Sequence, residues 1–441
     1  MTRTTTPIEA AVAIAAETSV EPDYRDPVHR MSQLLDPGSL EPVHRRAGLG
    51  VVVARGRIDG AEVVTYATDG SRLGGVIGAT ECRLIAEAID SAVARRCPVI
   101  GIWHTAGATP AEGAAAMDGV GRMYAAMVRA SGTVPQLSLV LGPATGGTAF
   151  GPALTDVVVM SAAGRMYVAG PDDVRSVTGD AVDPATLGGP EVHARSGAAH
   201  VVTEFEADAY RRARELVALF TRPGRYDLEA LRTHRDPSTL LPALADHGYD
   251  VRPLVAELLD RDSFVELQPR WAPNVVVGLG RLGRRTVGVV ANNPACAGGR
   301  LDATAAEKSA RFVRMCDALG VPLVTIVDVP GHLPGPDQEV AGAVRRGATL
   351  LHAFAESAVP RITLVTRHAH GSAAVAMNSR ALGANTVVAW PDAAPATDGY
   401  GEAIQLGLVD EVVDPVDTRR RLGELLAAAP AGRGKHTNIP L

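Results

Sequence analysis

A single spacing of 224 or 225 positions relates the two halves of this 441-residue chain and constrains its fold more than any other feature. In each half a helix-like segment leads through a proline into a short apolar strand, and a second proline-led strand then runs into a glycine. The matching landmarks are Pro98 with Pro322, Pro135 with Pro360, and Gly146 with Gly371. One offset that holds over several landmarks indicates the duplication of a domain of about 200 residues, not a solenoid of short repeats.

Each half also shows a regular alternation of elements. Amphipathic helical stretches alternate with short strands rich in Val, Ile and Leu, which is typical of β-α units with parallel, buried strands. We therefore expect an α/β protein with two domains, residues 25–240 and 241–441, after a flexible tail over residues 1–24. The boundary is expected in 221–253, a segment rich in Pro, Asp and His.

Composition excludes several classes of partner. The formal net charge is −6, and no run of Lys and Arg suggests a surface that binds nucleic acid. The sequence has no signal-peptide pattern and no apolar run of the roughly 18 residues that span a membrane, so we expect a cytoplasmic protein with no membrane partner. The four cysteines are scattered without a Cys-x-x-Cys pair, which indicates free thiols and no metal site: Cys82, Cys97, Cys296 and Cys316.

The turns that end the repeated strands are built from residues too small for side-chain chemistry. The strand at 362–366 is followed by RHAHGSAAVAMNS (367–379), and the strand after Pro98 leads into HTAGATPAEG (104–113). Small residues let the backbone approach a ligand closely. Two such turns, one after a strand and one at the start of a helix, can aim two N–H groups at one point, which an oxyanion hole requires.

Several long blocks make the chain resemble a known family. The first-half blocks are MVRASGTVPQLSLVLGPATGGTAFGPALTD (127–156), GPDDVRSVTGDAV (170–182) and LGGPEVHARSGAAH (187–200). The second-half blocks are NNPACAGGRLDATAAEKSARFVRMCDALGVPLVTIVDVPGHLPG (292–335), QEVAGAVRRGATLLHAFAESAVPRITLVTR (338–367) and KHTNIPL (435–441). Over residues 26–441 the chain is similar to the carboxyltransferase (β) subunits of biotin-dependent acyl-CoA carboxylases, of the single-chain acetyl- and propionyl-CoA carboxylase type.

This resemblance implies two tandem crotonase-like domains, each a β-β-α superhelix, related by internal duplication. It implies an enzyme that moves a carboxyl group from carboxybiotin to acetyl-CoA or propionyl-CoA, giving malonyl-CoA or methylmalonyl-CoA. Biotin is carried by a separate biotin carboxylase/carrier subunit, and the chain itself needs no metal and no ATP site. The family also suggests a homo-oligomer built from dimers, a hexamer, in which the first half of one chain faces the second half of another.

The resemblance also assigns site residues. Carried over by position, Gly146 and Gly147 hold the thioester enolate oxygen, and Ser372 and Ala373 hold the biotin ureido oxygen. Backbone N–H groups then take the place of a catalytic acid or nucleophile, and each donor contributes about 2.7–4 kcal/mol. The alternative, that small residues merely let a helix pack on a sheet, suits an isolated Gly-Gly pair better than one inside long matching blocks.

Both active-site turns depart from the family pattern. TAGAT (105–109) replaces Ser-Gly-Gly-Ala-Arg, which removes a guanidinium but keeps Gly107 and Ala108 as candidate substrate-binding residues. HGSAA (370–374) replaces Tyr-Gly-Gly-Ala-Tyr, so the side chain of Ser372 crowds the biotin side.

Two further departures affect the acyl-CoA site. Val375 stands where relatives hold a residue that controls acyl-chain choice, and it favours a short apolar acyl group. After Ala393 the chain lacks a Met-Gly-Ala block and a pair of helices, which in the family contribute to the acyl-CoA site and to the subunit contact.

The second-half turns carry histidines where the family has other residues. His332 and His370 replace aromatic residues of the family, and His368 replaces a basic one. His332 and His370 are expected on two turns that converge, where an imidazole pair can act as a general acid/base. The alternative is that they are polar groups at a pocket rim.

The departures from the family pattern leave a second class of function open. It comprises a biotin-independent acyl-CoA enzyme (decarboxylase, hydrolase or acyltransferase) or an inactive partner subunit.

Overall fold

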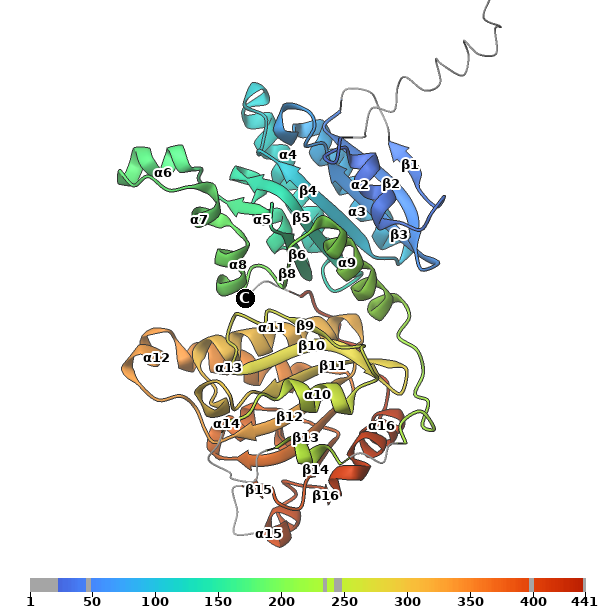
Figure 1. Cartoon of the computed structure of the whole chain (residues 1–441), viewed down its shortest axis with the longest axis vertical. Coiled ribbons are helices and arrows are strands. Elements are labelled where there is room, and N and C mark those ends of the chain that lie inside the picture. The colour runs from blue at the N-terminus through green and yellow to red at the C-terminus, as the bar shows by residue number, and fades with distance from the viewer. Residues whose placement is uncertain (1–22, 45–48, 233–235, 242–247, 396–399, 439–441) are drawn as a thin grey trace, which may run out of the picture.

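The computed structural model describes residues 23–44, 49–232, 236–241, 248–395 and 400–438. Two lobes lie one above the other, and each contains a mixed sheet of eight strands (Figure 1). The expected N-terminal tail lies, up to residue 22, outside the described residues.

The first sheet has the order β1-β2-β3-β4-β5-β6-β8, and β7 pairs with β5. Strands β1 to β3 pair antiparallel, and every pairing from β3 onward is parallel. The strands are Glu41–His44 (β1), Val51–Ile58 (β2), Ala61–Thr68 (β3), Val99–Thr105 (β4), Gln136–Thr145 (β5), Val157–Ser161 (β6), Arg165–Tyr167 (β7) and Val201–Thr203 (β8).

The second sheet repeats the first strand for strand, in the order β16-β14-β13-β12-β11-β10-β9 with β15 paired to β13. Its strands are Val265–Leu267 (β9), Val275–Leu282 (β10), Arg285–Asn292 (β11), Leu323–Val329 (β12), Arg361–Ala369 (β13), Thr386–Ala389 (β14), Ala394–Pro395 (β15) and Glu411–Val412 (β16). The central strands of both sheets are almost wholly buried, as continuous apolar runs between helices predict. The expected α/β class and the internal duplication are confirmed.

Helices cover both faces of each sheet. In the first lobe they are α2 (Pro27–Leu34), α3 (Ala79–Arg95), α4 (Ala114–Ala130), α5 (Phe150–Ala153), α6 (Pro171–Thr178), α7 (Pro184–Gly188), α8 (Pro190–Ser196) and α9 (Glu206–Thr221). In the second they are α10 (Arg252–Leu258), α11 (Ala303–Leu319), α12 (Pro336–Val340), α13 (Ala343–Glu356), α14 (Gly371–Ala376), α15 (Tyr400–Gln405) and α16 (Thr418–Ala428). The described 3₁₀ segments are Leu73–Gly75, Pro110–Glu112, Gly146–Thr148, Pro237–Leu240, Ala297–Gly299, Arg380–Leu382 and Pro415–Asp417. Among the described helices, none has the length and apolar character that a membrane span requires.

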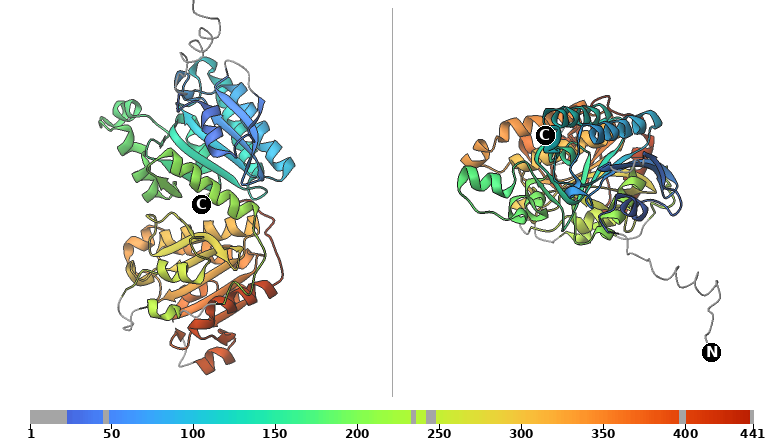
Figure 2. Two further views of the ribbon diagram at one scale, coloured as in Figure 1. Left: turned by 45° about the vertical axis from the view of Figure 1, so that its right-hand side comes forward. Right: turned by 90° about the horizontal axis from the view of Figure 1, so that it is seen from above.

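Helix α9 lies at the junction of the lobes, whereas α6 to α8 extend to the side of the first lobe (Figures 1 and 2). The buried face of α9, which includes Leu216 and Val217, packs on β5 and β6 and also contacts β10 of the second sheet. One apolar cluster therefore continues from the first lobe into the second, where it includes Leu279 and Phe312. This shared core joins the two sheets into one molecule.

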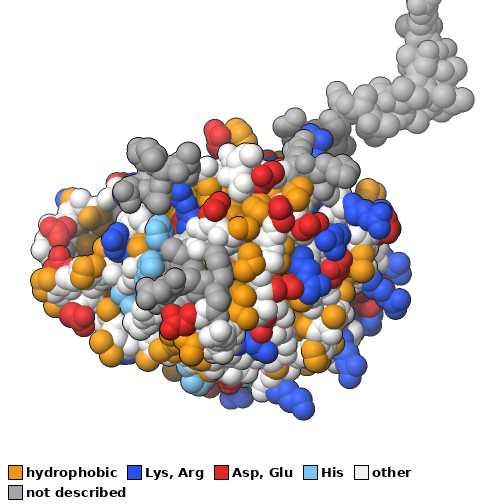
Figure 3. All heavy atoms as spheres, turned by 90° about the horizontal axis from the view of Figure 1, so that it is seen from below, with side chains coloured by type: hydrophobic (Ala, Val, Ile, Leu, Met, Phe, Trp, Pro, Cys, Tyr) orange, Lys and Arg blue, Asp and Glu red, His pale blue; other side chains and the backbone are white. Residues whose placement is uncertain are grey.

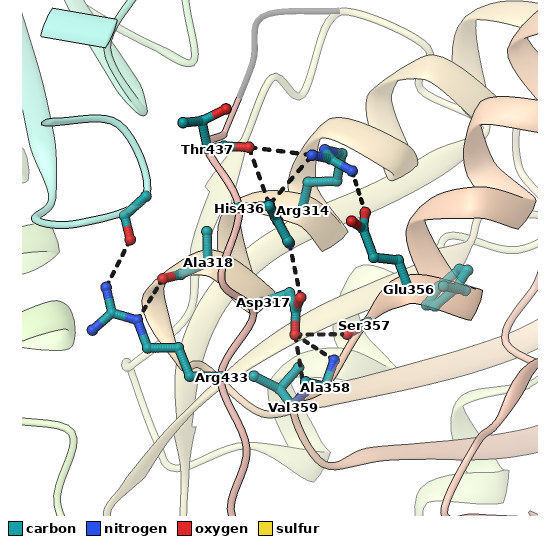
Figure 4. Close-up of polar contacts among 12 residues, drawn as sticks. Arg314, Asp317, Ala318, Glu356, Ser357, Ala358, Val359, Arg433, His436 and Thr437 are labelled. Atoms are coloured by element: carbon teal, nitrogen blue, oxygen red, sulfur yellow. Dashed lines mark hydrogen bonds and ion pairs between the residues drawn. The ribbon is translucent and has the colours of Figure 1, made fainter. Parts of the chain in front are cut away.

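Residues 433–438 run between the lobes and bind both of them (Figure 4). Arg433 Nε donates to Ala318 O of the second lobe at 2.6 Å, while its terminal nitrogen donates to Gly132 O of the first at 2.8 Å. Farther along, Asn438 Nδ2 donates to the carboxylate of Asp156 at 2.8 Å in the first lobe. The segment thus connects the lobes with hydrogen bonds on both sides.

The second-lobe anchor of this segment is a buried carboxylate at the end of α11. Asp317 Oδ2 lies 2.8 Å from His436 Nε2, and Oδ1 accepts from Ser357 Oγ and from the N–H groups of Ala358 and Val359 (Figure 4). Asp317 is 1% exposed, so its charge depends on these donors, because a buried carboxylate without partners is strongly unfavourable.

We predict that Asn438→Ala destabilises the protein. The change leaves the carboxylate of Asp156, itself 2% exposed, without its amide donor, and an unsatisfied buried acceptor costs about 1–3 kcal/mol. Thermal unfolding should show a lower midpoint than wild type. Lys435→Ala, in an exposed position of the same segment, is the control; equal midpoints for the two variants would contradict the prediction.

Candidate functional site

The loop after β4 and the turn after β5 lie side by side, because the two strands are parallel neighbours whose carboxyl ends meet at one edge of the sheet. Gly107 has a φ of 109°, and a Cβ added to it would stand 3.0 Å from the carbonyl oxygen of Thr145. The backbone conformation and the close approach of the two turns both require glycine at this position.

Hydrogen bonds inside the loop decide which N–H groups can face a ligand. Three of the four N–H groups of residues 106–109 are used within the protein, on Gly74 O, Thr105 Oγ1 and Ile77 O. The N–H of Gly107 is the one that donates to Thr105 Oγ1, at 3.1 Å. Within the described residues no acceptor faces the N–H of Ala108, so Ala108, and not Gly107, is the donor this loop can offer.

The turn Gly146–Thr148 is held through its carbonyl groups. Thr148 Oγ1 donates to Thr145 O at 2.8 Å, and the hydroxyl of Tyr124 on α4 donates to the carbonyl of Gly147. Burial raises the pKa of Tyr124 to about 12, so its hydroxyl stays protonated and remains a donor. The first N–H groups of a helical segment have no acceptor within that segment, which leaves those of the two glycines for a ligand.

The second half repeats this geometry. Gly146 and Gly371 have φ values of 60° and 59°, and each begins a helical segment, Gly146 directly after β5 and Gly371 with one residue between it and the end of β13. The bridge between Ile77 and Ala108 recurs 224 positions later, between Leu301 and His332. The backbone of position 332 therefore corresponds to that of Ala108, the available donor of the first half.

The duplication relates Gly147 to Ser372, and Thr148 to Ala373. Ser372 is exposed and Ala373 is fully buried, and both lie in the first turn of α14. Their N–H groups lack acceptors within the helix for the same reason as in the first half. Val375 follows on the same short helix and is 42% exposed.

Histidine side chains are visible at the surface of the second lobe when the molecule is viewed from below (Figure 3). The segments that carry His332 and His370 lie side by side, since the N–H of His370 donates to Val329 O, and the imidazole pair stays a prediction. The ring of His370 lies 5.7 Å from that of His368, and among the described residues no ring contact joins His370 to His332. Strand alternation puts positions 368 and 370 on one face, and the ring of His332 is exposed on the loop after β12.

A polar cluster stands beside these rings. His368 Nδ1 lies 2.8 Å from Asp328 Oδ1, which also accepts from the N–H of His368 at 3.1 Å. The hydroxyl of Tyr249 donates to Asp328 Oδ2 at 3.1 Å. Desolvation and the neighbouring carboxylate raise the pKa of Tyr249, so its hydroxyl stays protonated.

The first half holds a different cluster at the equivalent position. His104, which is 224 residues before Asp328, accepts from Arg30 at 3.2 Å through Nδ1. Arg30 is fully buried and pairs with Glu206 at 2.6 Å. Burial first, and then the charge of Arg30, lower the pKa of His104 to about 4. The ring of His104 is therefore neutral near pH 7, which lets it accept from the guanidinium.

Sequence reasoning placed the glycines correctly on the two turns but missed the residues that hold them. Tyr124 lies in a helix of ordinary composition, and no local pattern marks its bond to Gly147. Asp328 lies in the segment 292–335, yet its pairing with His368 depends on the register of two strands distant in sequence. In the part of the chain that the structure describes, no group of three His, Cys, Asp or Glu side chains is arranged to hold a metal ion.

The fold and these paired turns are shared with known proteins. The carboxyl transferase domain family matches residues 28–397, and the chain belongs to this family. It is 49% identical to the biotin-dependent acetyl-/propionyl-coenzyme A carboxylase beta6 subunit of Mycobacterium tuberculosis, over 95% of this chain and 97% of that one. It is 47% identical to the propionyl-CoA carboxylase beta chain of Rhodococcus erythropolis, over 97% and 98% of the two chains.

A solved structure agrees with these sequence matches. The transcarboxylase 12S hexamer with hydrolysed methylmalonyl-coenzyme A bound superposes with a TM-score of 0.85 at 34% identity, over 94% of this chain and 92% of that one. The expected pair of tandem crotonase-like domains is thereby confirmed.

We predict that His104 makes the folded protein less stable as the pH falls from about 6.5 to about 4. The pKa of His104 drops from its ordinary 6.5 to about 4 on folding, so in this window the unfolded chain binds a proton that the folded chain does not. Unfolding measured at pH 7 and pH 5 should show a smaller loss for His104→Gln than for wild type. Equal losses would mean that His104 titrates normally in the folded state.

Proposed function

We propose that this chain is the carboxyltransferase subunit of a biotin-dependent acyl-CoA carboxylase and that it carboxylates acetyl-CoA or propionyl-CoA. The observation that carries the proposal is the repeated pair of turns, in which Gly146 and Gly371 open helical segments with the same positive φ. Membership of the carboxyl transferase family supports it, as do relatives named acetyl-/propionyl-CoA and propionyl-CoA carboxylase subunits.

In the proposed first-half site, the thioester oxygen of acyl-CoA lies against the N–H groups of Gly146 and Gly147, with Ala108 as a neighbouring donor. Loss of the α-proton moves negative charge onto this oxygen, and each well-placed donor stabilises it by about 2.7–4 kcal/mol. Tyr124 and Thr148 hold the turn before substrate arrives. The donors then need no reorganisation when charge develops.

In the proposed second-half site, Ser372 and Ala373 present their N–H groups to the ureido oxygen of biotin. Carboxybiotin, brought by a separate biotin carboxylase/carrier subunit, supplies the carboxyl group when bound. The residues fit such a group, because a Cβ added at Gly371 or at Gly331 would meet nothing within 4 Å and the backbone there is open to a ligand.

Of the remaining predicted residues, Val375, His332 and His370 belong to the second half and Gly107 belongs to the first. We propose that Val375, which is apolar and 42% exposed, limits the acyl chain to a short one. His332 and His370 are proposed to contact substrate from the loop after β12 and the end of β13. Gly107 is proposed to act by letting two turns approach, since its own N–H is already used.

We propose a homo-oligomer built from dimers, a hexamer, with the first half of one chain facing the second half of another. Large apolar side chains that are almost fully exposed on both lobes support such contacts: Leu73, Val177, Val340 and Val344. The transcarboxylase 12S structure is itself a hexamer assembly.

The proposed domains are residues 25–240 and 241–441, and the proposed compartment is the cytoplasm.

Gly147→Val should strongly reduce carboxylation while the protein remains folded. A Cβ at this position would stand 3.1 Å from Met117 Cε, the end of a flexible side chain, so the fold can accept it. The added methyl groups should block the thioester from the donors, and we expect activity to fall on the order of 10²–10³-fold. The assay measures biotin-dependent carboxylation of acetyl-CoA and propionyl-CoA.

The matched control is Gly121→Val on α4, where an added Cβ meets nothing within 4 Å. It should carboxylate like wild type. Wild-type turnover by Gly147→Val would remove the first-half assignment.

The oligomer is tested on the full-length protein. Light scattering at micromolar concentration should give the mass of a hexamer, or of a dimer that assembles further. The reason is that an active site shared between facing lobes is incomplete in a monomer. A monodisperse monomer that still carboxylates acyl-CoA would contradict the shared site.

A further inference from the structure

The cluster of Asp328, His368 and Tyr249 has no part in the proposed carboxyl transfer, which uses backbone donors. It lies where β12 and β13 end, three residues before the glycine that opens α14. Asp328 is almost fully buried, with a side chain 4% exposed, whereas that of His368 is 29% exposed. The cluster therefore has a buried anchor and an accessible imidazole next to the second-half turn.

The hydrogen bonds set the tautomer of this imidazole. A carboxylate only accepts hydrogen bonds, so His368 Nδ1 carries the proton that faces Asp328 Oδ1 at 2.8 Å. The lone pair of a neutral imidazole is then on Nε2, and no other hydrogen bond of this ring exists among the described residues. A histidine oriented through Nδ1 by a buried carboxylate, with Nε2 accessible, has the arrangement of a general base.

The other groups around the cluster preserve this state. Tyr249 donates to the second oxygen of Asp328 at 3.1 Å, and the guanidinium of Arg367 lies 5.6 Å from the centre of the Tyr249 ring. Asp328 thus has donors besides the imidazole, namely Tyr249 and the backbone N–H of His368. Satisfying the buried carboxylate does not by itself demand an imidazole at position 368.

We propose that the Asp328–His368 dyad is a proton acceptor for the α-carbon of an acyl-CoA thioester, and that the protein exchanges this proton with solvent in the absence of biotin. The inference rests on the proposed function, because it takes the thioester to be held by Gly146 and Gly147 of a facing subunit. His368 is the catalytic base, and Asp328 and Tyr249 are positioning residues.

The step balances without a further reactant. The α-carbon–hydrogen bond breaks and a hydrogen–Nε2 bond forms, while the electron pair moves onto the thioester oxygen to give the enolate. The N–H donors of Gly146 and Gly147 stabilise that oxygen. The imidazolium exchanges its proton with water and returns a solvent proton to the α-carbon, which regenerates both the thioester and the base.

The test incubates the full-length, biotin-free protein with propionyl-CoA in D₂O and follows the thioester by mass spectrometry. Wild type should incorporate deuterium at the α-carbon in a time- and enzyme-dependent manner. His368→Lys should slow incorporation at least tenfold, because an ammonium keeps Asp328 paired but cannot accept a proton. His352→Gln, at an exposed position of α13, is the control and should match wild type.

Asp328→Asn separates positioning from a structural role. The amide no longer enforces the Nδ1–H tautomer, so the exchange rate at saturating propionyl-CoA should fall at least tenfold while KM stays near the wild-type value. Thermal unfolding and CoA binding by calorimetry establish that each variant is folded. If a variant does not fold, His368→Gln gives a second test of the same base.

The outcomes distinguish this inference from the proposed function. Biotin-dependent carboxylation with no biotin-free exchange overturns the dyad and leaves the carboxyltransferase intact. Exchange that His368→Lys retains at the wild-type rate also overturns it, since the base must then be elsewhere. A wild-type protein that neither binds nor carboxylates propionyl-CoA contradicts the proposed function, and with it the place of the thioester.

Discussion

An irregular register between parallel strands is the constraint on which both half-sites depend. In the first sheet Trp103 pairs with Val140 and Thr105 pairs with Ala144. An advance of two residues along β4 therefore corresponds to an advance of four residues along β5. The second sheet has the same irregularity, from the Val327–Val365 pair to the Val329–Ala369 pair. Such an irregularity bends a strand end and re-aims its side chains, which here brings the loop after one strand against the turn after the next.

The residue inside the irregularity differs between the halves, and this difference sets their chemistry. The first half has His104. Its ring packs against Gly142, and only glycine fits there, because a Cβ on Gly142 would lie 2.3 Å from His104 Nδ1. The second half has the smaller Asp328, whose carboxylate lies 2.8 Å from His368 Nδ1. One duplicated backbone thus carries a neutral, buried imidazole beside Arg30 in one half and an accessible, carboxylate-oriented imidazole in the other.

The relation between the halves is fixed by packing and by hydrogen bonds that cross the junction. Helix α9 belongs to the first lobe but buries its apolar face against both sheets, so one face of each sheet contributes to a shared core, while the other apolar clusters stay within one lobe. Residues 433–438 add bonds to carbonyls and carboxylates of both lobes, and the carboxylates of Asp156 and Asp317 are buried and would be costly to leave unsatisfied. Packing and hydrogen bonds therefore join the two lobes in one molecule.

The sequence by itself determined the features that local chemistry dictates. The offset of 224–225 residues predicted the duplicated sheets, and the glycines at 146 and 371 marked the turns, because only glycine adopts their positive φ without strain. The long matching blocks identified the family over most of the chain. Each of these inferences uses residues that lie close together in the sequence or recur at a constant interval.

Only the tertiary structure decided which groups face one another. It commits the N–H of Gly107 to Thr105 and leaves that of Ala108 available. It also pairs His368 with Asp328, a contact that the sequence did not predict. Hydrogen bonds act over about 3 Å, and strand register places groups 40 residues apart within that distance, so composition and spacing along the chain cannot identify these partners.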